Sequence, residues 1–165
     1  MSLVEVIIYS ALSALLLSVL GGLFYVGFQT QAAAGGRDAA TGAAGVVSNS
    51  LQTGIRRASS ISASGTLVKA RVATGTASWQ CVAWALTSDN KLVYKSSATP
   101  ITATDYSTWT VLAVGASGRL GSGSAFLGVA SQLTYSLAFT SGGMTVPVAG
   151  VATATAFGAG SPESC

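Results

Sequence analysis

The chain has 165 residues, of which 8 are Lys or Arg, 5 are Asp or Glu and none is His. Charged residues make up 8%, against about 25% in an ordinary soluble domain, and apolar residues make up 50%. This composition excludes intrinsic disorder and every catalytic mechanism that needs histidine. Two cysteines without histidine cannot supply the four ligands of an ordinary zinc site, so we expect no metal and no cofactor.

The positive charges are too sparse to predict a nucleic-acid interface. The formal net charge is +3, but Arg56-Arg57 is the one adjacent pair of basic residues. A nucleic-acid-binding domain normally gathers its cations on one face, often with aromatic residues between them. We therefore interpret these charges as solubilising.

The N-terminal 36 residues contain a single charged residue, Glu5, and residues 6–28 contain none. As a helix, these 23 residues would be roughly 34 Å long, enough to cross a hydrocarbon core of about 30 Å. A signal peptide has basic residues before its apolar stretch. Here none precedes the apolar run, and the first cation is Arg37. We expect that a short basic leader precedes Met1 and is removed, which makes Met1 a processed end.

Glu5 is the unusual residue of this segment. A carboxylate near the centre of a bilayer costs about 2.5–3.5 kcal/mol, and less near an interface. Its partner could be the α-amino group of Met1, in the same chain or in a neighbouring one. Alternatively, Glu5 lies at the membrane interface and stabilises the helix N-terminus through the macrodipole.

The first eight residues, Met1-Ser2-Leu3-Val4-Glu5-Val6-Ile7-Ile8, resemble the mature N-terminus of a type IV pilin or pseudopilin. In that family a prepilin peptidase removes a basic leader and methylates the new N-terminus. The family motif then has Ser or Thr, Leu, Ile or Val, and Glu as its second to fifth residues. The chain matches at Ser2, Leu3, Val4 and Glu5, and departs at Met1, where Phe is usual. The close resemblance covers about 30 residues, and beyond them it is architectural.

The resemblance implies roles for four residues. Glu5 would neutralise the amine of Met1 on the adjacent subunit during filament assembly, and this pair would fix the axial offset between subunits, as buried polar pairs fix register in coiled coils. Gly21 and Gly22 would be the place where the helix unwinds in the filament, although the proline common in that region of pilins is absent. The alternative for the two glycines is close helix packing in the membrane.

The helix is predicted to continue beyond the membrane as an amphipathic segment. Residues 32–44 are small and glycine-rich, and we expect a kink at Gly35-Gly36. Apolar residues then recur at helical spacing, followed by Arg56-Arg57 near the expected end of the helix at residues 62–65. These residues are Val46, Val47, Leu51, Ile55, Ala58 and Ile61.

From residue 66 the apolar period changes to two, which predicts strands. The expected strands are 66–74, 79–86, 91–95, 108–114, 132–140 and 144–157, with hairpin turns at 87–90 and 141–143. Pro147 predicts an edge or a bulge in the last strand. The fold class is therefore α+β: a long N-terminal helix packed against one mainly antiparallel sheet of four to six strands, the ladle shape of pilins. We expect a membrane or filament-core half of the helix (1–30), an amphipathic half (31–64) and a β-sheet head (65–165).

Cys81 and Cys165 are expected to form a disulfide, because an even number of cysteines in an exported protein usually pairs. It would attach the last residue of the chain to an early strand.

Three further patterns are given structural interpretations. The glycine-rich stretch 115–128 lacks the phosphate-binding signature and is predicted to be a surface loop. Three acidic residues are too scattered in the sequence to predict a carboxylate pair or a calcium loop. Six aromatic residues are predicted to be core and sheet anchors rather than a sugar platform. The acidic residues are Asp89, Asp105 and Glu163, and the aromatic residues are Trp79, Trp84, Trp109, Tyr94, Tyr106 and Tyr135.

Taken together, the sequence predicts a structural protein and no catalytic site. The expected function is that of a type IV pilus-like filament subunit, most simply the major pilin, which is inserted in the inner membrane before assembly and is extracellular afterwards. Its implied partners are further copies of the chain, the prepilin peptidase and the pilus assembly machinery. The alternatives are a minor pilin, a type II secretion pseudopilin, or a membrane-anchored adhesin or DNA receptor. The low charge of the head also suits a subunit that packs against neighbours.

Overall fold

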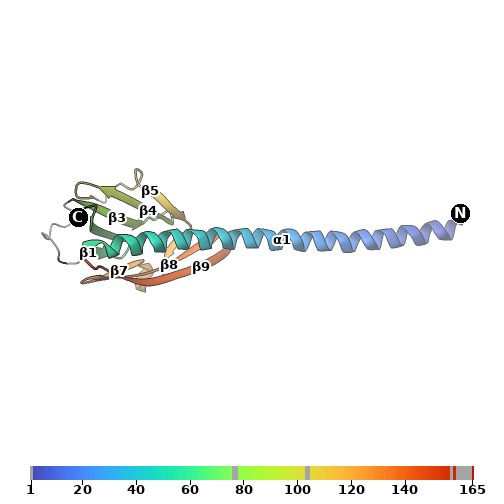
Figure 1. The fold of residues 1–165 in the computed structure, drawn as a ribbon. Coiled ribbons are helices and arrows are strands. Elements are labelled where there is room, and N and C mark those ends of the chain that lie inside the picture. Colours follow the sequence, from blue (N-terminus) through green and yellow to red (C-terminus); the bar gives the residue numbers. More distant parts are fainter. Residues whose placement is uncertain (1, 76–77, 103–104, 157, 159–164) are drawn as a thin grey trace.

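The computed structural model describes residues 2–75, 78–102, 105–156, 158 and 165. A single long helix, α1 (Leu3–Arg56), projects from a β-rich head, and the N-terminus lies at the far end of the helix (Figure 1). At 1.5 Å per residue its 54 residues are about 81 Å long. The predicted fold class, a long helix on antiparallel β-structure, is confirmed. The helix passes through Gly21-Gly22 and Gly35-Gly36 without interruption, so the kink expected at the second pair is not present.

The helix ends earlier than predicted, because residues 58–64 form a strand. β1 (Ala58–Ser64) pairs with β2 (Leu67–Ala73), so Ala58 and Ile61 enter the core from a sheet rather than from the helix. Serine alternates with other residues along most of this stretch, and its side chain competes with helical hydrogen bonds. The segment 31–64 is therefore not one helical unit. Thr155 satisfies the helix end, since its N–H and Oγ donate to the carbonyl oxygen of Arg56 at 3.1 and 2.7 Å.

Five strands form a first antiparallel sheet in the order β1-β2-β3-β4-β5. Four of them lie where the period-two pattern predicts, and the turn 87–90 joins β3 to β4 with Asn90 in the left-handed region (φ 57°). The four predicted strands are β2, β3 (Trp79–Leu86), β4 (Lys91–Ser97) and β5 (Thr110–Val114).

The remaining strands form a second antiparallel sheet, so the expectation of one sheet with four to six strands is wrong. β8 (Gln132–Ser141) pairs with β9 (Met144–Thr153) on one side, and with β6 (Ala116–Gly118) and β7 (Phe126–Val129) on the other. The stretch 115–128 is thus no simple surface loop: it contains β6, a 3₁₀ turn (Gly121–Gly123) and β7, and Phe126 is buried. Pro147 lies in β9, at the sheet edge as predicted. Phe157, the expected end of this strand, lies outside the described residues.

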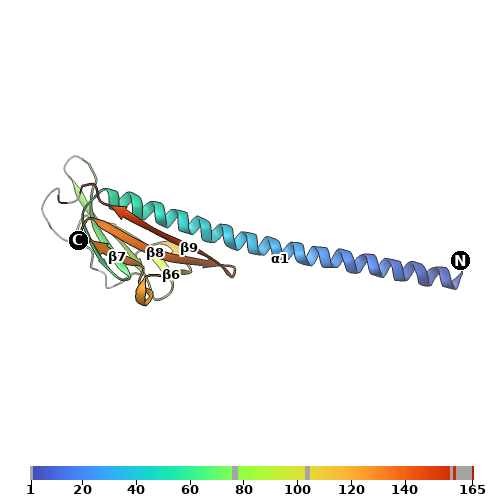
Figure 2. The same ribbon diagram turned by 90° about the horizontal axis from the view of Figure 1, so that it is seen from below.

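The two sheets and the C-terminal half of α1 enclose one core. In Figure 1 the sheets lie on opposite sides of the helix, and Figure 2 shows β9 running alongside it. The helix contributes a buried stripe at spacings of three and four, and the largest fully buried side chains of the strands are Trp84, Tyr135, Phe126 and Phe139. The stripe is Gly36, Ala40, Ala44, Val47, Leu51 and Ile55.

Gly36 and Gly54 allow the helix to lie close to the sheets. A Cβ atom on Gly36 would lie 2.7 Å from the carbonyl oxygen of Ser141 and 3.1 Å from the Cα atom of Gly142, at the tip of the β8–β9 hairpin. A Cβ atom on Gly54 would overlap the Trp84 ring. The glycines that weaken this helix by propensity therefore include two that its packing requires.

We expect Gly36→Ala to destabilise the fold by about 1–3 kcal/mol, because the new methyl group meets backbone atoms of the hairpin. The matched control is Gly35→Ala, where no atom lies within 4 Å of the added Cβ. That substitution is expected to stabilise by up to about 1 kcal/mol through helix propensity. Thermal unfolding of the full chain in detergent, followed by circular dichroism, measures both. Equal stability of the two variants would contradict the close contact.

Candidate functional site

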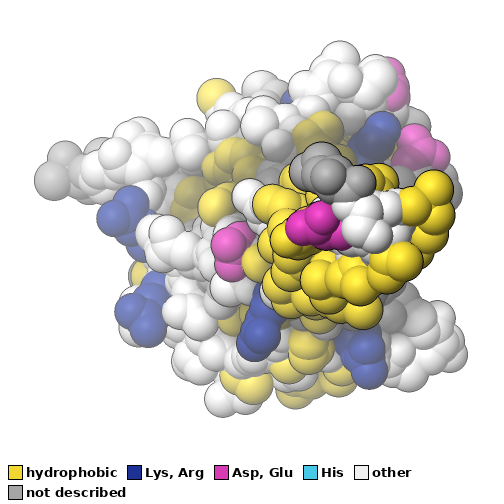
Figure 3. Space-filling model, turned by 90° about the vertical axis from the view of Figure 1, so that its right-hand side faces the viewer, with side chains coloured by type: hydrophobic (Ala, Val, Ile, Leu, Met, Phe, Trp, Pro, Cys, Tyr) yellow, Lys and Arg dark blue, Asp and Glu magenta, His cyan; other side chains and the backbone are white. Residues whose placement is uncertain are grey.

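The N-terminal half of α1 is an apolar rod that no described part of the head covers. Every residue from Ser2 to Gly35 is exposed, and the large hydrophobic side chains between Leu3 and Phe28 are 48–78% exposed. In length and composition this part of the helix is sufficient to cross a membrane. Figure 3, which views the molecule from its N-terminal end, shows hydrophobic side chains covering the near end of the helix with an acidic group among them. Such a surface is stable only when lipid or other protein covers it.

Glu5 lies in the first turn of this rod. Its Oε2 atom accepts a hydrogen bond from the backbone N–H of Ser2 at 3.3 Å, which is one half of a capping box. In the single chain the carboxylate therefore caps the helix N-terminus, and the position of Glu5 relative to a membrane stays a prediction. Met1 lies outside the described residues, so its predicted pairing with Glu5 stays a prediction.

Gly21 and Gly22 lie in regular helix, on the exposed rod. No atom lies within 4 Å of the position that a Cβ atom would occupy on either residue. The pair therefore leaves a smooth, narrow section of helix. Both hypotheses, unwinding in the filament and close helix packing, stay predictions.

The predicted disulfide between Cys81 and Cys165 is confirmed, with an S–S distance of 2.06 Å and a Cα–Cα distance of 5.5 Å. It attaches the chain end to the face of the first sheet that is opposite the helix. The carbonyl oxygen of Cys165 accepts hydrogen bonds from the N–H of Ile101 at 3.2 Å and from Nζ of Lys69 at 3.5 Å. Lys69 Nζ also donates to the Ile101 carbonyl at 2.6 Å. A second small core fills this face, made of Cys81, Ala83, Ala85, Val93, Ile101 and Trp109.

The aromatic residues serve mainly as anchors, as predicted. Trp84, Trp109 and Tyr135 are buried, and Trp84 Nε1 donates to the Ser50 hydroxyl of α1 at 2.9 Å. The Tyr135 hydroxyl is 2.9 Å from that of Ser48 and accepts from the amide of Gln52 at 3.2 Å. The other three are half-buried: Tyr94 and Tyr106 contact the rings of Trp84 and Trp109, and Trp79 lies beneath the guanidinium of Arg71.

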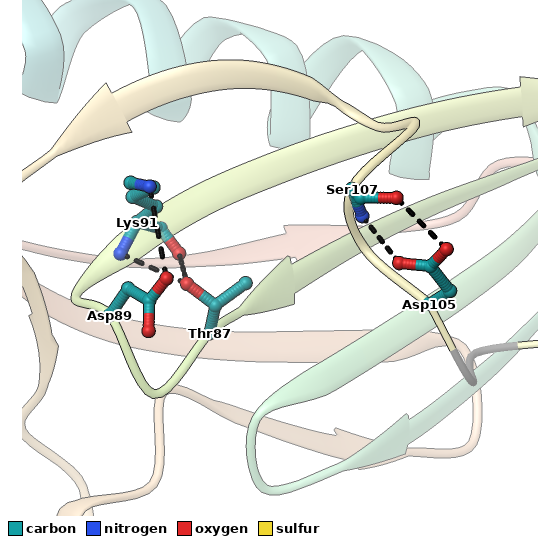
Figure 4. A network of polar contacts seen from close by, with 5 residues as sticks. All are labelled: Thr87, Asp89, Lys91, Asp105 and Ser107. Atoms are coloured by element: carbon teal, nitrogen blue, oxygen red, sulfur yellow. Dashed lines mark hydrogen bonds and ion pairs between the residues drawn. The ribbon is translucent and has the colours of Figure 1, made fainter.

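Asp89 and Asp105 lie closer than their separation in sequence indicated, since both line one open hollow of about 410 Å³. Each carboxylate already has a partner (Figure 4): Asp89 lies 3.8 Å from Nζ of Lys91, and Asp105 accepts from the N–H and Oγ of Ser107 at 2.8 and 2.9 Å. Thr87, in the same turn, donates its hydroxyl to the Lys91 carbonyl at 3.1 Å. Within the described part of the chain, no three side chains of metal-binding type come together. Glu163 lies outside it.

The hydrogen bonds from the N–H and hydroxyl of Ser107 lower the pKa of Asp105 below its usual range, and the charge of Lys95 adds to this effect. A lowered folded-state pKa means that the ionised form stabilises the turn at neutral pH. That contribution disappears as the pH falls through the folded-state pKa. We expect Ser107→Ala to raise the titration midpoint of the Asp105 carboxyl carbon in an NMR titration, but not to its unfolded value, because the backbone bond remains. An unchanged midpoint would contradict this assignment.

Comparisons of the chain with protein-family models, with curated proteins and with solved structures gave no match. The observed layout is a long helix with an exposed apolar half, packed at its other end on two antiparallel sheets, with a disulfide between the first sheet and the last residue of the chain. This layout is compatible with a pilin-like fold.

Proposed function

We propose that this chain is a structural subunit of a type IV pilus-like filament, and that it is the major subunit. The observation that carries the proposal is the rod of α1: an exposed apolar helical surface that has Glu5 as its single charge, begins with Ser-Leu-Val-Glu and projects from a folded head. Burying one leucine or isoleucine side chain is worth about 1.5–3 kcal/mol, so the rod has a strong drive to be covered. A bilayer covers it before assembly, and neighbouring rods cover it in a fibre.

Glu5 gives this assembly its register. Inside a bundle of apolar helices an unpaired carboxylate is costly, and the nearest available cation is the α-amino group at the end of another copy. An axial offset that brings these two groups together is favoured over all others. The processed, methylated N-terminus and cleavage by a prepilin peptidase are part of the same proposal.

We propose that the helix unwinds locally at Gly21 and Gly22, which would change the length of the rod in the filament. A locally extended segment rises about 3.3 Å per residue instead of 1.5 Å, which would lengthen the rod within the fibre. A filament reconstruction distinguishes the two hypotheses, because an unbroken helix through both glycines would leave close packing as their role.

Electron microscopy of sheared surface material, with mass spectrometry of its main band, tests the proposal. Filaments built mainly from this chain are the expected result. Filaments in which this chain is a trace component would instead indicate a minor pilin or a pseudopilin. If the chain stays in the membrane without filaments, and the gene encodes no basic leader before Met1, a membrane-anchored adhesin or DNA receptor is the better interpretation.

A further inference from the structure

The two sheets of the head differ sharply in charge. The strands of the first sheet contain Lys69, Arg71, Lys91 and Lys95. The strands of the second sheet contain no charged residue, and neither does any position between Arg119 and Glu163. Of the 12 charged residues in 37–165, 11 therefore lie in 37–119, so the part of the head after Arg119 contains a single charged residue, Glu163.

The second sheet exposes an uncharged face on the side away from the core. Register places Leu127, Thr134 and Val151 in one row across the sheet, with Val129, Gln132 and Thr153 in the next. Leu127, Val129 and Val151 are 55%, 64% and 57% exposed. We call this surface the neutral face, defined by these six residues together with Ser136 and Ala149.

Water-exposed sheets usually carry charged side chains, and edge strands in particular carry lysine, which prevents unwanted pairing. The neutral face has neither, although β9 is an edge strand. The first sheet, by contrast, has its corresponding face covered by its own chain and bordered by cations that contact Trp79 and Trp109. The first sheet thus carries charged side chains, as water-exposed surfaces do, and the second sheet carries none. A lack of charged residues is typical of the centre of a protein interface.

We propose that the neutral face binds a second copy of this chain. The inference rests on the proposed filament function and adds to it the surface through which the heads meet. Three strands at about 4.8 Å and ten residues at about 3.4 Å cover roughly 500 Å², below the 800 Å² per partner of a stable standard-size complex. A partner bound only here would dissociate readily, so the face suits a partner that a second contact already holds.

The helix rod supplies that second contact. The tip of the β8–β9 hairpin contacts α1 at Gly36, where the segment with Glu5 as its single charge ends. The neutral face and the rod are thereby joined through one hairpin, with β9 running alongside α1 (Figure 2). The eight residues that define the neutral face carry no charge, so a partner held mainly by ion pairs would find no counter-charge on them, whereas an uncharged surface of a second copy needs none.

Photo-crosslinking in cells identifies the partner directly. Benzoylphenylalanine is placed at position 151 or 127 of the full chain, with position 111 of β5 as the control, since Val111 is 50% exposed on the edge of the first sheet. The expected result is an adduct of two copies of this chain from positions 151 and 127, and little from position 111. No adduct, or an adduct with a different protein, would overturn the inference.

A matched pair of lysine variants gives a second readout. Val151→Lys is expected to reduce filament number roughly tenfold or more, because it puts an unpaired cation into a dry contact, whereas Val111→Lys leaves filaments near the wild-type number. Membrane levels of both, measured by immunoblot, exclude failure to fold. Normal filaments in Val151→Lys, or equal losses in both variants, would overturn the neutral face as an interface and leave the filament proposal standing. If the wild type makes no filaments, the filament proposal fails, and the crosslink from position 151 still decides whether two copies meet at this face.

Discussion

Replacing Glu5 by valine is expected to leave the protein in the membrane and to abolish most or all filaments. Valine removes the single charge of the rod, so membrane insertion becomes easier rather than harder. What is lost is the carboxylate that we propose pairs with the N-terminal amine of a neighbouring copy, and with it the preference for one axial offset. Electron microscopy of filaments, together with membrane fractionation, measures the two effects separately.

Glu5→Gln is the control that separates charge from capping. The glutamine amide oxygen can still accept the hydrogen bond that Ser2 N–H donates to Glu5 at 3.3 Å, but it carries no charge. If the cap alone matters, this variant assembles normally. If pairing with the amine matters, Glu5→Gln makes few or no filaments, as Glu5→Val does. Normal filaments in both variants would contradict the hypothesis that Glu5 sets the axial offset.

Removing the disulfide, with Cys81→Ala and Cys165→Ala together, is expected to cost the head roughly 4–5 kcal/mol, an upper value from the chain entropy of a loop closed over 84 positions. A domain of this size is stable by about 5–15 kcal/mol, so the variant would be close to unfolding. The small core around Trp109 should loosen first, because Cys165 and Ile101 help to close it. Denaturant unfolding followed by tryptophan fluorescence measures the loss.

Reduction of the wild-type protein is the matched control, since it opens the same loop without changing a side chain. Both routes should lower the unfolding midpoint by a similar amount. A loss below about 1 kcal/mol by either route would mean that the attachment of Cys165 contributes little, and that Lys69 and its two carbonyl partners hold the chain end without it.

The elements that sequence reasoning predicted well are those with long, regular patterns. The uncharged run and the apolar stripe through Val47, Leu51 and Ile55 specify the helix, and period-two alternation specifies β2 and β8. The disulfide followed from the cysteine count. The helix and the strands are predicted from properties that repeat along the chain, and their apolar positions are the ones buried in the core.

Most of the wrong predictions concern features that depend on contacts between residues far apart in the sequence. The helix stops at Arg56 because the serine-rich stretch after it pairs with β2, a tertiary contact that helical spacing at Ala58 and Ile61 concealed. β6 and β7 have three and four residues within a glycine-rich stretch, too short to show a period. Gly36 looked like a weakness of the helix because the hairpin that it contacts lies more than 100 residues later. The division into two sheets likewise depends on which strands pair, and the alternation of apolar residues does not determine strand pairing.

The contact between Gly36 and the hairpin tip also fixes where the head begins along the rod. Below it, residues 29–35 are seven residues of continuous helix, about 10 Å long, between the apolar run and the head. In a membrane these residues would act as a stiff spacer rather than a tether. Every copy would then carry its head at the same height above the lipid, free mainly to turn about its own helix axis. Two heads that meet would already be level, and a half-turn of one molecule would be enough to bring a chosen side towards its neighbour.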